Sequence, residues 1–283
     1  MTTTERPEIG QNAVANGIST NYLEDGKDSD PTVLLVHGSG PGVTSYANWR
    51  LVIPALAENF HVVAPDMVGF GYSDRPEGVQ YGLDTWADQT VGLMDTLGIE
   101  KAHLVGNSFG GAIALRIATQ HADRVDKLVL MGSMGVPFPI TEGLDRVWGY
   151  EPSFENMRKV LDVFAYSREL VNDELAQVRY EGSIQPGFQE AFSAMFPADE
   201  SGSRQRWVEA MVTPDDELRA LPHRVLIVHG REDKVIPVSN SYRLEELIDR
   251  ADLAVFSHCG HWSMIERTSD FNRLVGDFFL EKA

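Results

Sequence analysis

One pentapeptide constrains the fold of this chain more than any other segment: residues 106–110 read Gly-Asn-Ser-Phe-Gly. A strand-like apolar run, 101–105, precedes it, and a helix-like run of small residues, 111–118, follows. A serine on such a sharp turn exposes its hydroxyl, and glycines at 106 and 110 avoid collisions with the neighbouring helix and strand. This context predicts a nucleophilic Ser108, although a turn whose serine only caps the helix also fits.

Short apolar runs alternate with helical patterns along most of the chain. The runs predict buried strands at 32–36, 60–64, 102–105, 127–131, 224–229 and 253–256, with helices at 48–58, 84–97, 110–120, 239–249 and 268–281. Continuous apolar runs are typical of parallel strands that are covered on both faces. The alternation therefore predicts an α/β fold with a mostly parallel, doubly wound sheet. Segment 13–23 is expected to add one antiparallel strand at the edge.

The alternation stops between about residues 136 and 215, where the chain is helical in character and rich in aromatic residues. We therefore expect a core domain formed by 1–135 and 215–283, with a helical lid (cap) inserted at 136–214. Most aromatic side chains of this lid are expected to form its own core, and only a few to face a substrate. Residues 199–203 are expected to form an exposed loop.

Composition argues against several classes of function. The 283 residues carry a net charge of −18, which opposes binding to nucleic acid because phosphate requires a positive field. The sequence has no apolar stretch near the roughly 18 residues that span a bilayer and no signal-peptide pattern. We therefore expect a cytoplasmic protein without a membrane partner. The charge also opposes capture of an anionic substrate, so a local cation would have to hold one.

A catalytic serine needs a base, and the base needs an acid that orients it. Asp233 comes directly after the predicted strand 224–229, and His261 follows the predicted strand 253–256. The carboxyl ends of parallel strands meet at one edge of a sheet, where open α/β sheets build their sites. The sequence therefore predicts that Ser108, His261 and Asp233 converge there as nucleophile, base and acid.

Both partners of the serine have a neighbouring alternative, Glu232 beside Asp233 and His258 before His261. We favour Asp233 because it lies deeper in its loop, and His261 because the preceding glycine lets the chain aim it inward. The run that starts at His258 also suggests a zinc site. However, Cys259 is the only cysteine and no second ligand cluster is evident, so no metal is expected.

A tetrahedral intermediate also requires hydrogen-bond donors for its oxyanion. One donor is expected to be the backbone N–H of Phe109, directly after the nucleophile. The other is expected from the loop after the strand 32–36, which reads His-Gly-Ser-Gly-Pro-Gly, with Ser39 as the favoured residue. We expect His37, which opens this loop, to stabilise it rather than to take part in chemistry.

Five segments stand out together, namely His37–Val43, Asn48–Arg50, Pro65–Gly71, Gly106–Gly111 and Gly260–Trp262. This set resembles the meta-cleavage product hydrolases, which are α/β-hydrolases that cut carbon–carbon bonds in aromatic degradation. The resemblance extends from about residue 9 to residue 281. Three further segments, 131–136, 147–154 and 187–197, are most similar to members that act on 2-hydroxymuconate semialdehyde.

The resemblance implies an α/β-hydrolase fold, with Ser108, Asp233 and His261 as the triad and Ser39 and Phe109 as the oxyanion donors. Residues expected to surround the substrate are Asn48, Asn107, Arg179 and Trp262. Arg179 would be the local cation, because a guanidinium grips a carboxylate with two parallel bonds. Met134 and Ile236 are expected beside the pocket for the leaving acyl group, and Cys259 is expected at a small position of the pocket wall.

The reaction implied is hydrolysis of 2-hydroxymuconate semialdehyde (2-hydroxy-6-oxohexa-2,4-dienoate) to 2-hydroxypenta-2,4-dienoate and formate. The partner is thus a small anionic dienoate, no metal or organic cofactor is expected, and a homodimer is expected from the resemblance alone. Three alternatives remain open. These are a hydrolase for larger alkyl- or phenyl-substituted ring-fission products, a carboxylesterase of the same fold, and an inactive fold that serves as a ligand receptor.

Overall fold

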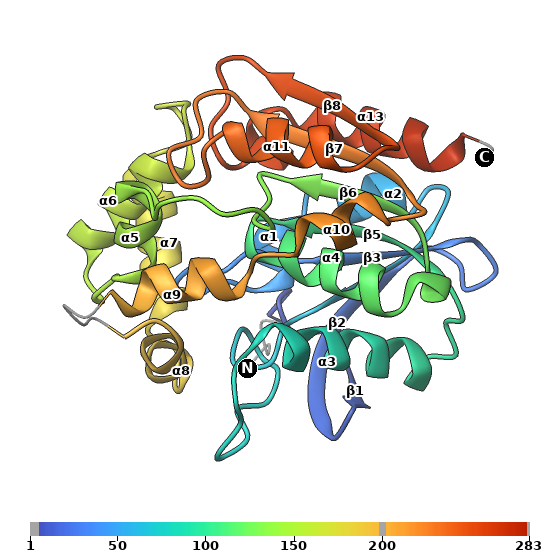
Figure 1. Ribbon diagram of the computed structural model, residues 1–283. Coiled ribbons are helices and arrows are strands. Elements are labelled where there is room, and N and C mark those ends of the chain that lie inside the picture. Colours follow the sequence, from blue (N-terminus) through green and yellow to red (C-terminus); the bar gives the residue numbers. More distant parts are fainter. Residues whose placement is uncertain (1–5, 198–201, 282–283) are drawn as a thin grey trace.

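A computed structural model describes residues 6–197 and 202–281, and an eight-stranded sheet forms its centre (Figure 1). The strand order is β1-β2-β4-β3-β5-β6-β7-β8. The pairs from β4 through β8 are parallel, whereas β2 is antiparallel to both β1 and β4. The predicted α/β fold with a mostly parallel sheet is confirmed.

The predicted parallel strands are all present, and each boundary lies within two residues of its predicted position. They are β3 (Thr32–Val36), β4 (His61–Pro65), β5 (Ala102–Asn107), β6 (Val125–Met131), β7 (Arg224–Gly230) and β8 (Ala251–Phe256). The helices between them are α3 (Leu83–Thr96), α4 (Phe109–Gln120), η1 (Ala122–Arg124), α10 (Asp215–Arg219), α11 (Ser239–Leu247), α12 (Ser263–Glu266) and α13 (Thr268–Leu280).

The prediction of a single strand over 13–23 is wrong, because this segment belongs to a hairpin. Its strands are β1 (Gln11–Ala15) and β2 (Ile18–Asp25). Asn16 and Gly17 join them with φ angles of 48° and 80°. Two successive positive φ angles are typical of the tight hairpin turn that the Asn-Gly pair favours.

The prediction of one helix over 48–58 is also wrong. The structure has two short helices instead, α1 (Ser45–Trp49) and α2 (Ile53–Leu56). Pro54 explains the break, because proline has no N–H to donate to the carbonyl four residues earlier and its ring clashes with that carbonyl. Proline is tolerated in the first turn of a helix, which is where Pro54 lies in α2.

Apolar side chains cover both faces of the sheet. Along β3, Val33 and Leu35 pack into a cluster with α1, α2 and α13, whereas Leu34 and Val36 pack into a second cluster with α3, α4 and α11. Successive residues of a strand point to opposite faces. A strand buried on both sides must therefore be apolar at every position, which explains the continuous runs in the sequence.

The lid segment, residues 136–214, contributes helices that gather on one side of the sheet (Figure 1). They are α5 (Glu142–Trp148), α6 (Phe154–Phe164), α7 (Asp173–Ser183), α8 (Phe188–Met195) and α9 (Ser203–Ala210). The loop predicted at 199–203 lies outside the described residues up to 201, and Ser203 already begins α9.

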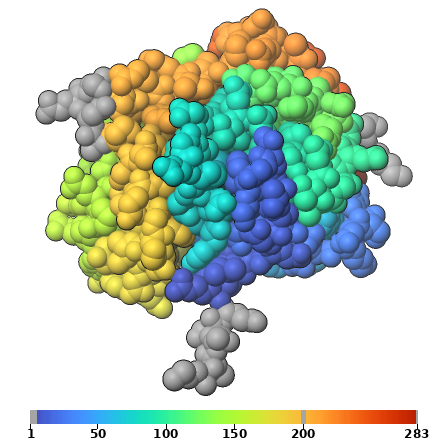
Figure 2. Space-filling model, turned by 90° about the horizontal axis from the view of Figure 1, so that it is seen from below, coloured from blue at the N-terminus to red at the C-terminus, as the bar shows by residue number. Residues whose placement is uncertain are grey.

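Aromatic contacts join the lid segment to the core, and the two form one continuous surface in Figure 2. The Arg75 guanidinium lies 4.6 Å from the centre of the Phe188 ring. The rings of Trp86 and Trp207 lie 5.7 Å apart. Within the described ranges 6–197 and 202–281, we find no helix with both the length and the apolar character needed to cross a membrane.

Candidate active site

Ser108 lies at the turn between β5 and α4, with φ 57° and ψ −115°. Residues other than glycine seldom adopt such a backbone, and strain of this kind gathers at functional sites. A Cβ at Gly106 would lie 2.5 Å from the carbonyl oxygen of Gly110, and a Cβ at Gly110 would lie 2.3 Å from that of Val36. The collisions predicted for both glycines are confirmed.

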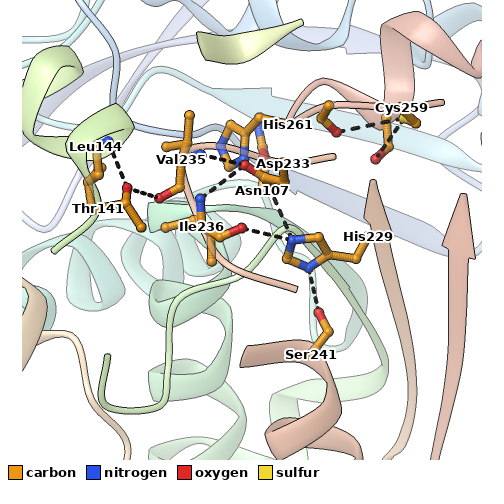
Figure 3. Close-up of polar contacts among 12 residues, drawn as sticks. Asn107, Thr141, Leu144, His229, Asp233, Val235, Ile236, Ser241, Cys259 and His261 are labelled. Atoms are coloured by element: carbon orange, nitrogen blue, oxygen red, sulfur yellow. Dashed lines mark hydrogen bonds and ion pairs between the residues drawn. The ribbon is translucent and has the colours of Figure 1, made fainter. Parts of the chain in front are cut away.

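Asp233 follows β7, and both of its carboxylate oxygens are bound (Figure 3). Oδ1 accepts the backbone N–H groups of Val235 at 2.7 Å and Ile236 at 3.0 Å. Oδ2 lies 2.6 Å from Nδ1 of His261. Burial acts to raise the pKa of Asp233, but the charge of His261 and the hydrogen bonds of His229 and His261 outweigh it and hold the pKa well below its usual range. Asp233 is therefore a carboxylate at neutral pH.

His261 lies in the loop between β8 and α12, where its backbone N–H donates to the Phe164 carbonyl at 2.7 Å. Because Nδ1 donates to Asp233, the neutral ring has Nε2 as its free acceptor. Gly132 packs closely against the His261–Asp233 pair. A Cβ at Gly132, whose φ is +50°, would lie 3.2 Å from Nδ1 of His261 and 3.3 Å from Oδ2 of Asp233. A Cβ at this position would therefore push the pair by a few tenths of an ångström.

The neighbouring alternatives make other contacts. Glu232 accepts the backbone N–H of Cys259 at 3.0 Å, so it stabilises the loop before the histidine. The ring of His258 lies 5.7 Å from that of Tyr166. The structure therefore brings Asp233, and not Glu232, to the imidazole of His261.

The two expected oxyanion donors come from two different segments near Ser108. Phe109 is the first residue of α4, and the N–H groups of a first helical turn have no partner within the helix. Ser39 lies in the loop after β3 and lines the same cavity as Ser108. Its Oγ accepts the indole N–H of Trp148 at 2.9 Å. The hydroxyl is thus bound by the lid, which leaves the backbone N–H of Ser39 as the group predicted to face the oxyanion.

His37 holds the loop that carries Ser39. Its Nδ1 donates to the Gly38 carbonyl at 2.7 Å, and its Nε2 accepts the backbone N–H of Met67 at 2.9 Å. Burial lowers the pKa of His37 to about 4, against the opposing bond to Gly38. A neutral ring with both nitrogens bonded fits the structural role expected for it.

The candidate site surrounds a cavity of about 20 Å³, which is lined by Gly38, Ser39, Gly40, Val43, Asn48, Asn107, Ser108, Phe164, Arg179, Val235, His261 and Trp262. This volume matches roughly one water molecule. The structure therefore brings together the predicted serine, histidine, loop serine, two asparagines, arginine and tryptophan, although four distant parts of the chain supply them.

Two asparagines form a polar wall of the cavity. Asn48 Oδ1 accepts the side-chain N–H of Asn107 at 3.0 Å and the backbone N–H of Gly38 at 3.3 Å. Within the described part of the chain, Asn48 Nδ2 and Asn107 Oδ1 are buried without a partner. Buried polar atoms are rarely left unpaired, so this donor and this acceptor are available to a ligand.

Arg179 of α7 is the cation of the cavity. Its Nη2 donates to the Pro41 carbonyl at 3.2 Å, and its Nε is buried without a partner among residues 6–197 and 202–281. Burial and the nearby charge of Arg50 lower the pKa of Arg179 to about 10, so the guanidinium is still charged at neutral pH. A buried charge without a counter-ion is costly, and an anionic ligand would supply one.

The three predicted acyl-pocket residues are buried close to the site, but they are not among the described residues that line the cavity. Met134 donates its backbone N–H to the Ser108 carbonyl at 3.1 Å. Ile236 binds Asp233 through its backbone, as described above. Burial raises the pKa of the Cys259 thiol to about 12, so this sulfur is a neutral wall atom. Their contact with a substrate stays a prediction.

Among the described residues, one group of side chains has the composition of a metal site, and it lies away from Ser108. Ligand atoms of Glu24, Asp28 and His61 lie within 4.8 Å of one another. His61 is the first residue of β4, so the group lies at the amino end of that strand, whereas Ser108 follows the carboxyl end of β5. His61 Nε2 is already bonded to Glu24 Oε1 at 2.7 Å.

Sequence reasoning missed one residue of the site, His229 (Figure 3). It is fully buried at the end of β7, and its Nε2 lies 3.2 Å from Oδ2 of Asp233 and 3.0 Å from the Ile236 carbonyl. Its Nδ1 lies 2.6 Å from Oγ of Ser241. The only signal in the sequence was a polar residue at the end of an otherwise apolar strand.

Comparison with known proteins agrees with this arrangement. The model of a family described as "alpha/beta hydrolase fold" matches residues 31–268. The chain is 58% identical to "2-hydroxymuconate semialdehyde hydrolase" of Pseudomonas sp. (strain CF600), over 97% of this chain and 95% of the relative. It is 54% identical to "2-hydroxy-6-oxo-2,4-heptadienoate hydrolase" of Pseudomonas putida (strain ATCC 700007 / DSM 6899 / JCM 31910 / BCRC 17059 / LMG 24140 / F1), over 96% of both chains.

A solved structure extends the comparison to three dimensions. It is the meta-cleavage product hydrolase CumD from Pseudomonas fluorescens IP01, as a serine-to-alanine mutant complexed with acetates. The TM-score is 0.94 at 57% identity, and the alignment covers 97% of this chain and 98% of that one. The chain therefore belongs to the α/β-hydrolase fold family and, within it, to the meta-cleavage product hydrolases.

Proposed function

We propose that this protein hydrolyses the C5–C6 bond of 2-hydroxymuconate semialdehyde to give 2-hydroxypenta-2,4-dienoate and formate, within the meta-cleavage degradation of aromatic compounds. The observation that carries the proposal is the guanidinium of Arg179, which lines the same cavity as Ser108 and His261 and whose buried Nε has no hydrogen-bond partner within the described residues. A neutral ester has no negative charge to pair with a cation at this place, whereas the carboxylate of a dienoate does. The names of the relatives described above support the same substrate class.

In the proposed complex, the carboxylate of the substrate pairs with Arg179. The unsatisfied amide atoms of Asn48 and Asn107 then bind the oxygens at the same end, and Trp262 covers the planar diene. Trp262 is stacked on Phe164, with ring centres 4.7 Å apart and planes 11° apart, so the two rings offer a flat apolar surface. This placement directs C6 of the substrate towards Ser108.

Ketonisation prepares the bond for cleavage. The 2-hydroxyl loses a proton and C5 gains one, which gives a chain with ketone oxygen at C2 and the aldehyde at C6. When the C5–C6 bond breaks, its electron pair is delocalised through C4 and C3 to the C2 oxygen, so no isolated carbanion forms. Arg179, Asn48 and Asn107 stabilise the charge that develops at this end.

The triad carries out the attack at C6. His261 accepts a proton through Nε2, and Asp233 stabilises the imidazolium through Nδ1. Attack by Ser108, or by a water that Ser108 assists, puts the negative charge on the C6 oxygen, next to the backbone N–H groups of Phe109 and Ser39. Cleavage leaves C6 as formate after addition of the elements of water, and protonation of the C2 oxygen completes the dienol.

The direct test is to incubate the purified protein with freshly prepared ring-fission product, following the loss of its visible absorbance and assaying formate. We expect one formate for each molecule of substrate consumed. Absorbance that persists, in a protein that still cleaves p-nitrophenyl acetate, would assign the site to ester hydrolysis instead.

A second candidate substrate is the methyl-substituted ring-fission product, because a relative that is 54% identical is named for a heptadienoate. The buried Met134 bears on this choice, as a bulky side chain on the predicted acyl side. Comparing kcat/KM for hydrogen, methyl, isopropyl and phenyl at C6 discriminates these substrates. We expect kcat/KM to fall in that order.

The proposal includes a cytoplasmic location, with which the free, buried Cys259 is consistent. It also includes a homodimer, for which the resemblance to the family is the only support. Cell fractionation and size-exclusion chromatography with light scattering test these two statements.

A further inference from the structure

A second cavity adjoins the catalytic one. It measures about 310 Å³ and is lined by Ala47, Arg50, Leu170, Asn172, Glu174, Leu175, Val178, Arg179, Trp262 and Ile265. We call it the outer cavity. Arg179 and Trp262 line both cavities, so these two side chains form the partition between them.

The sizes of the two cavities show why the partition matters. The catalytic cavity, at about 20 Å³, has room for roughly one water molecule, whereas ligand sites measure about 300–1,000 Å³. A dienoate can therefore reach Ser108 only if part of the wall moves. The outer cavity already has the dimensions of a ligand site, and it reaches the partition.

The partition is lightly held on the arginine side. Arg179 makes one side-chain hydrogen bond in the described part of the chain, the 3.2 Å bond to Pro41, and its Nε makes none. The guanidinium can exchange this single bond for a bidentate bond to a carboxylate at little cost. The bond between an incoming carboxylate and Arg179 thus supplies the energy for moving the Arg179 side chain.

The charges around the outer cavity suit an anion. Arg50 and Arg179 are its two basic lining residues and Glu174 is its one acidic lining residue. Neither arginine forms a carboxylate pair within residues 6–197 and 202–281, and Arg50 donates instead to the Ala47 carbonyl at 2.8 Å. In a chain of net charge −18, an anion needs such a local positive field to approach.

The remaining lining is largely apolar, with Leu170, Leu175, Val178 and Ile265 beside the indole of Trp262. A ligand that fits must therefore have a charged end and a planar apolar body. The dienoate named in the proposed function, on which this inference rests, has both features.

We propose that the outer cavity is the route by which the anionic dienoate reaches Ser108, and that Arg50 binds its carboxylate before Arg179 does. Arg50 then binds the carboxylate in the outer cavity, and Arg179 binds it in the catalytic cavity. The substrate passes between them as the partition opens.

The charge is tested with Arg50→Gln, with Arg250→Gln as the matched control. Arg250 is an exposed arginine that also donates to a backbone carbonyl, that of Pro222 at 3.1 Å, and it lies just before the amino end of β8, away from the site. At low ionic strength we expect Arg50→Gln to lower kcat/KM for the dienoate by roughly 3- to 10-fold and Arg250→Gln to leave it unchanged. The difference should shrink in high salt.

The route itself is tested at Val178, an exposed position of α7 that lines the outer cavity. Val178→Trp fills the cavity, whereas Val178→Ala enlarges it. If this is the route, Val178→Trp lowers kcat/KM for both the dienoate and the neutral ester p-nitrophenyl acetate. Val178→Ala leaves both values within about twofold of the wild type.

The two substrates separate the possible failures. Arg50→Gln must spare the ester, because the ester has no carboxylate to attract. In Arg50→Gln, an equal loss for both substrates or a loss that high salt does not reduce overturns the proposed route but leaves the proposed function intact. A Val178→Trp variant with wild-type rates has the same consequence. A wild-type protein that cleaves the ester and not the dienoate overturns both. Thermal unfolding of each variant verifies that it is folded.

Discussion

Replacement of His229 tests how the triad acid is held in place. The Ile236 carbonyl and the Asp233 carboxylate can only accept hydrogen bonds, and both lie near Nε2 of His229, at 3.0 and 3.2 Å. Nε2 therefore carries a hydrogen, and Nδ1 lies 2.6 Å from the Ser241 hydroxyl. His229→Leu removes the donor at similar volume, whereas His229→Gln keeps an N–H in reach of Asp233.

The expected magnitude follows from the geometry. A hydrogen bond to a charged group contributes about 1.5–3 kcal/mol, and sharing of the N–H with a carbonyl places this one near about 1.5 kcal/mol. Since about 1.4 kcal/mol corresponds to one pKa unit, His229→Leu should raise the pKa of Asp233 by about one unit. Without the hydrogen bond from His229, less of the negative charge of Asp233 is offset. The carboxylate therefore stabilises the protonated ring of His261 more strongly.

The assay is the pH profile of kcat/KM. His261 must be neutral to accept a proton, so a more stable imidazolium moves the acid limb of the profile to higher pH, by up to about one unit in His229→Leu. His229→Gln should keep the wild-type limb. A purely structural role would lower the rate equally at all pH values. An unmoved limb in His229→Leu, or equal shifts in both variants, refutes the reasoning.

Stability gives an independent readout with a defined sign. The pKa of Asp233 is held below its unfolded value, so its contacts stabilise the fold above the unfolded pKa, near 4, and this stability is lost as the pH falls through the folded value. With the donor removed, the folded pKa lies closer to the unfolded value, so less stability is lost on acidification. Thermal unfolding of His229→Leu should therefore depend less on pH below about 4 than that of the wild type, and the difference in stability between the two proteins should be largest at neutral pH and shrink in acid.

Three further substitutions test the rest of the site. Ser108→Ala should lower kcat by at least about 10⁴-fold and still bind the coloured dienoate, and near-normal turnover would reject the triad. Arg179→Gln should raise KM for the dienoate by roughly 30- to 150-fold, which corresponds to about 2–3 kcal/mol for a charge-assisted bond, and an unchanged KM would place the carboxylate elsewhere. Gly132→Ala should lower kcat at least about 10-fold through its contacts with Asp233 and His261. The control Gly98→Ala, which has a φ of +70° and no atom within 4 Å of its Cβ, should lower stability but not kcat.

The sheet was predictable because a strand that is buried on both faces must be apolar at every position. The two errors in the elements arose where a short signal interrupts a longer pattern. Asn16 and Gly17 turn the chain inside an alternating run, and Pro54 removes one N–H inside a helical run. Both signals were present in the sequence, but backbone conformation at one or two residues outweighed the periodicity around them.

The meeting of Ser108, Asp233 and His261 was predictable for a topological reason. Parallel strands place their carboxyl ends at one edge, so residues that follow β5, β7 and β8 meet without any knowledge of side-chain packing. Arg179 was different, because its acceptor, Pro41, is 138 residues away and on another layer. No local pattern connects a lid helix with that loop, so its position came from the resemblance to a family.

His229 was missed although all of its partners lie within 12 residues of it. A histidine at the end of a strand can face the core, the solvent or the site, and the period of the strand does not distinguish these. The orientation of the His229 ring depends on the start of α11, which places Ser241 next to Nδ1 of the ring. Polar networks of this kind depend on the packing of two elements, and sequence patterns describe one element at a time.

Arg179 of α7 lines the catalytic cavity from the lid side. Loop residues 38–42 contact α7 through the Arg179 bond to Pro41 and through the tight approach of Gly42, where a Cβ would lie 2.6 Å from the backbone nitrogen of Ser183. Ser108, in contrast, is fixed by a backbone bond to β6 at 2.8 Å. Since Ser39 belongs to the same loop, movement of α7 is expected to shift this oxyanion donor while the nucleophile stays in place. Binding of a carboxylate at Arg179 would then also position Ser39 for the reaction.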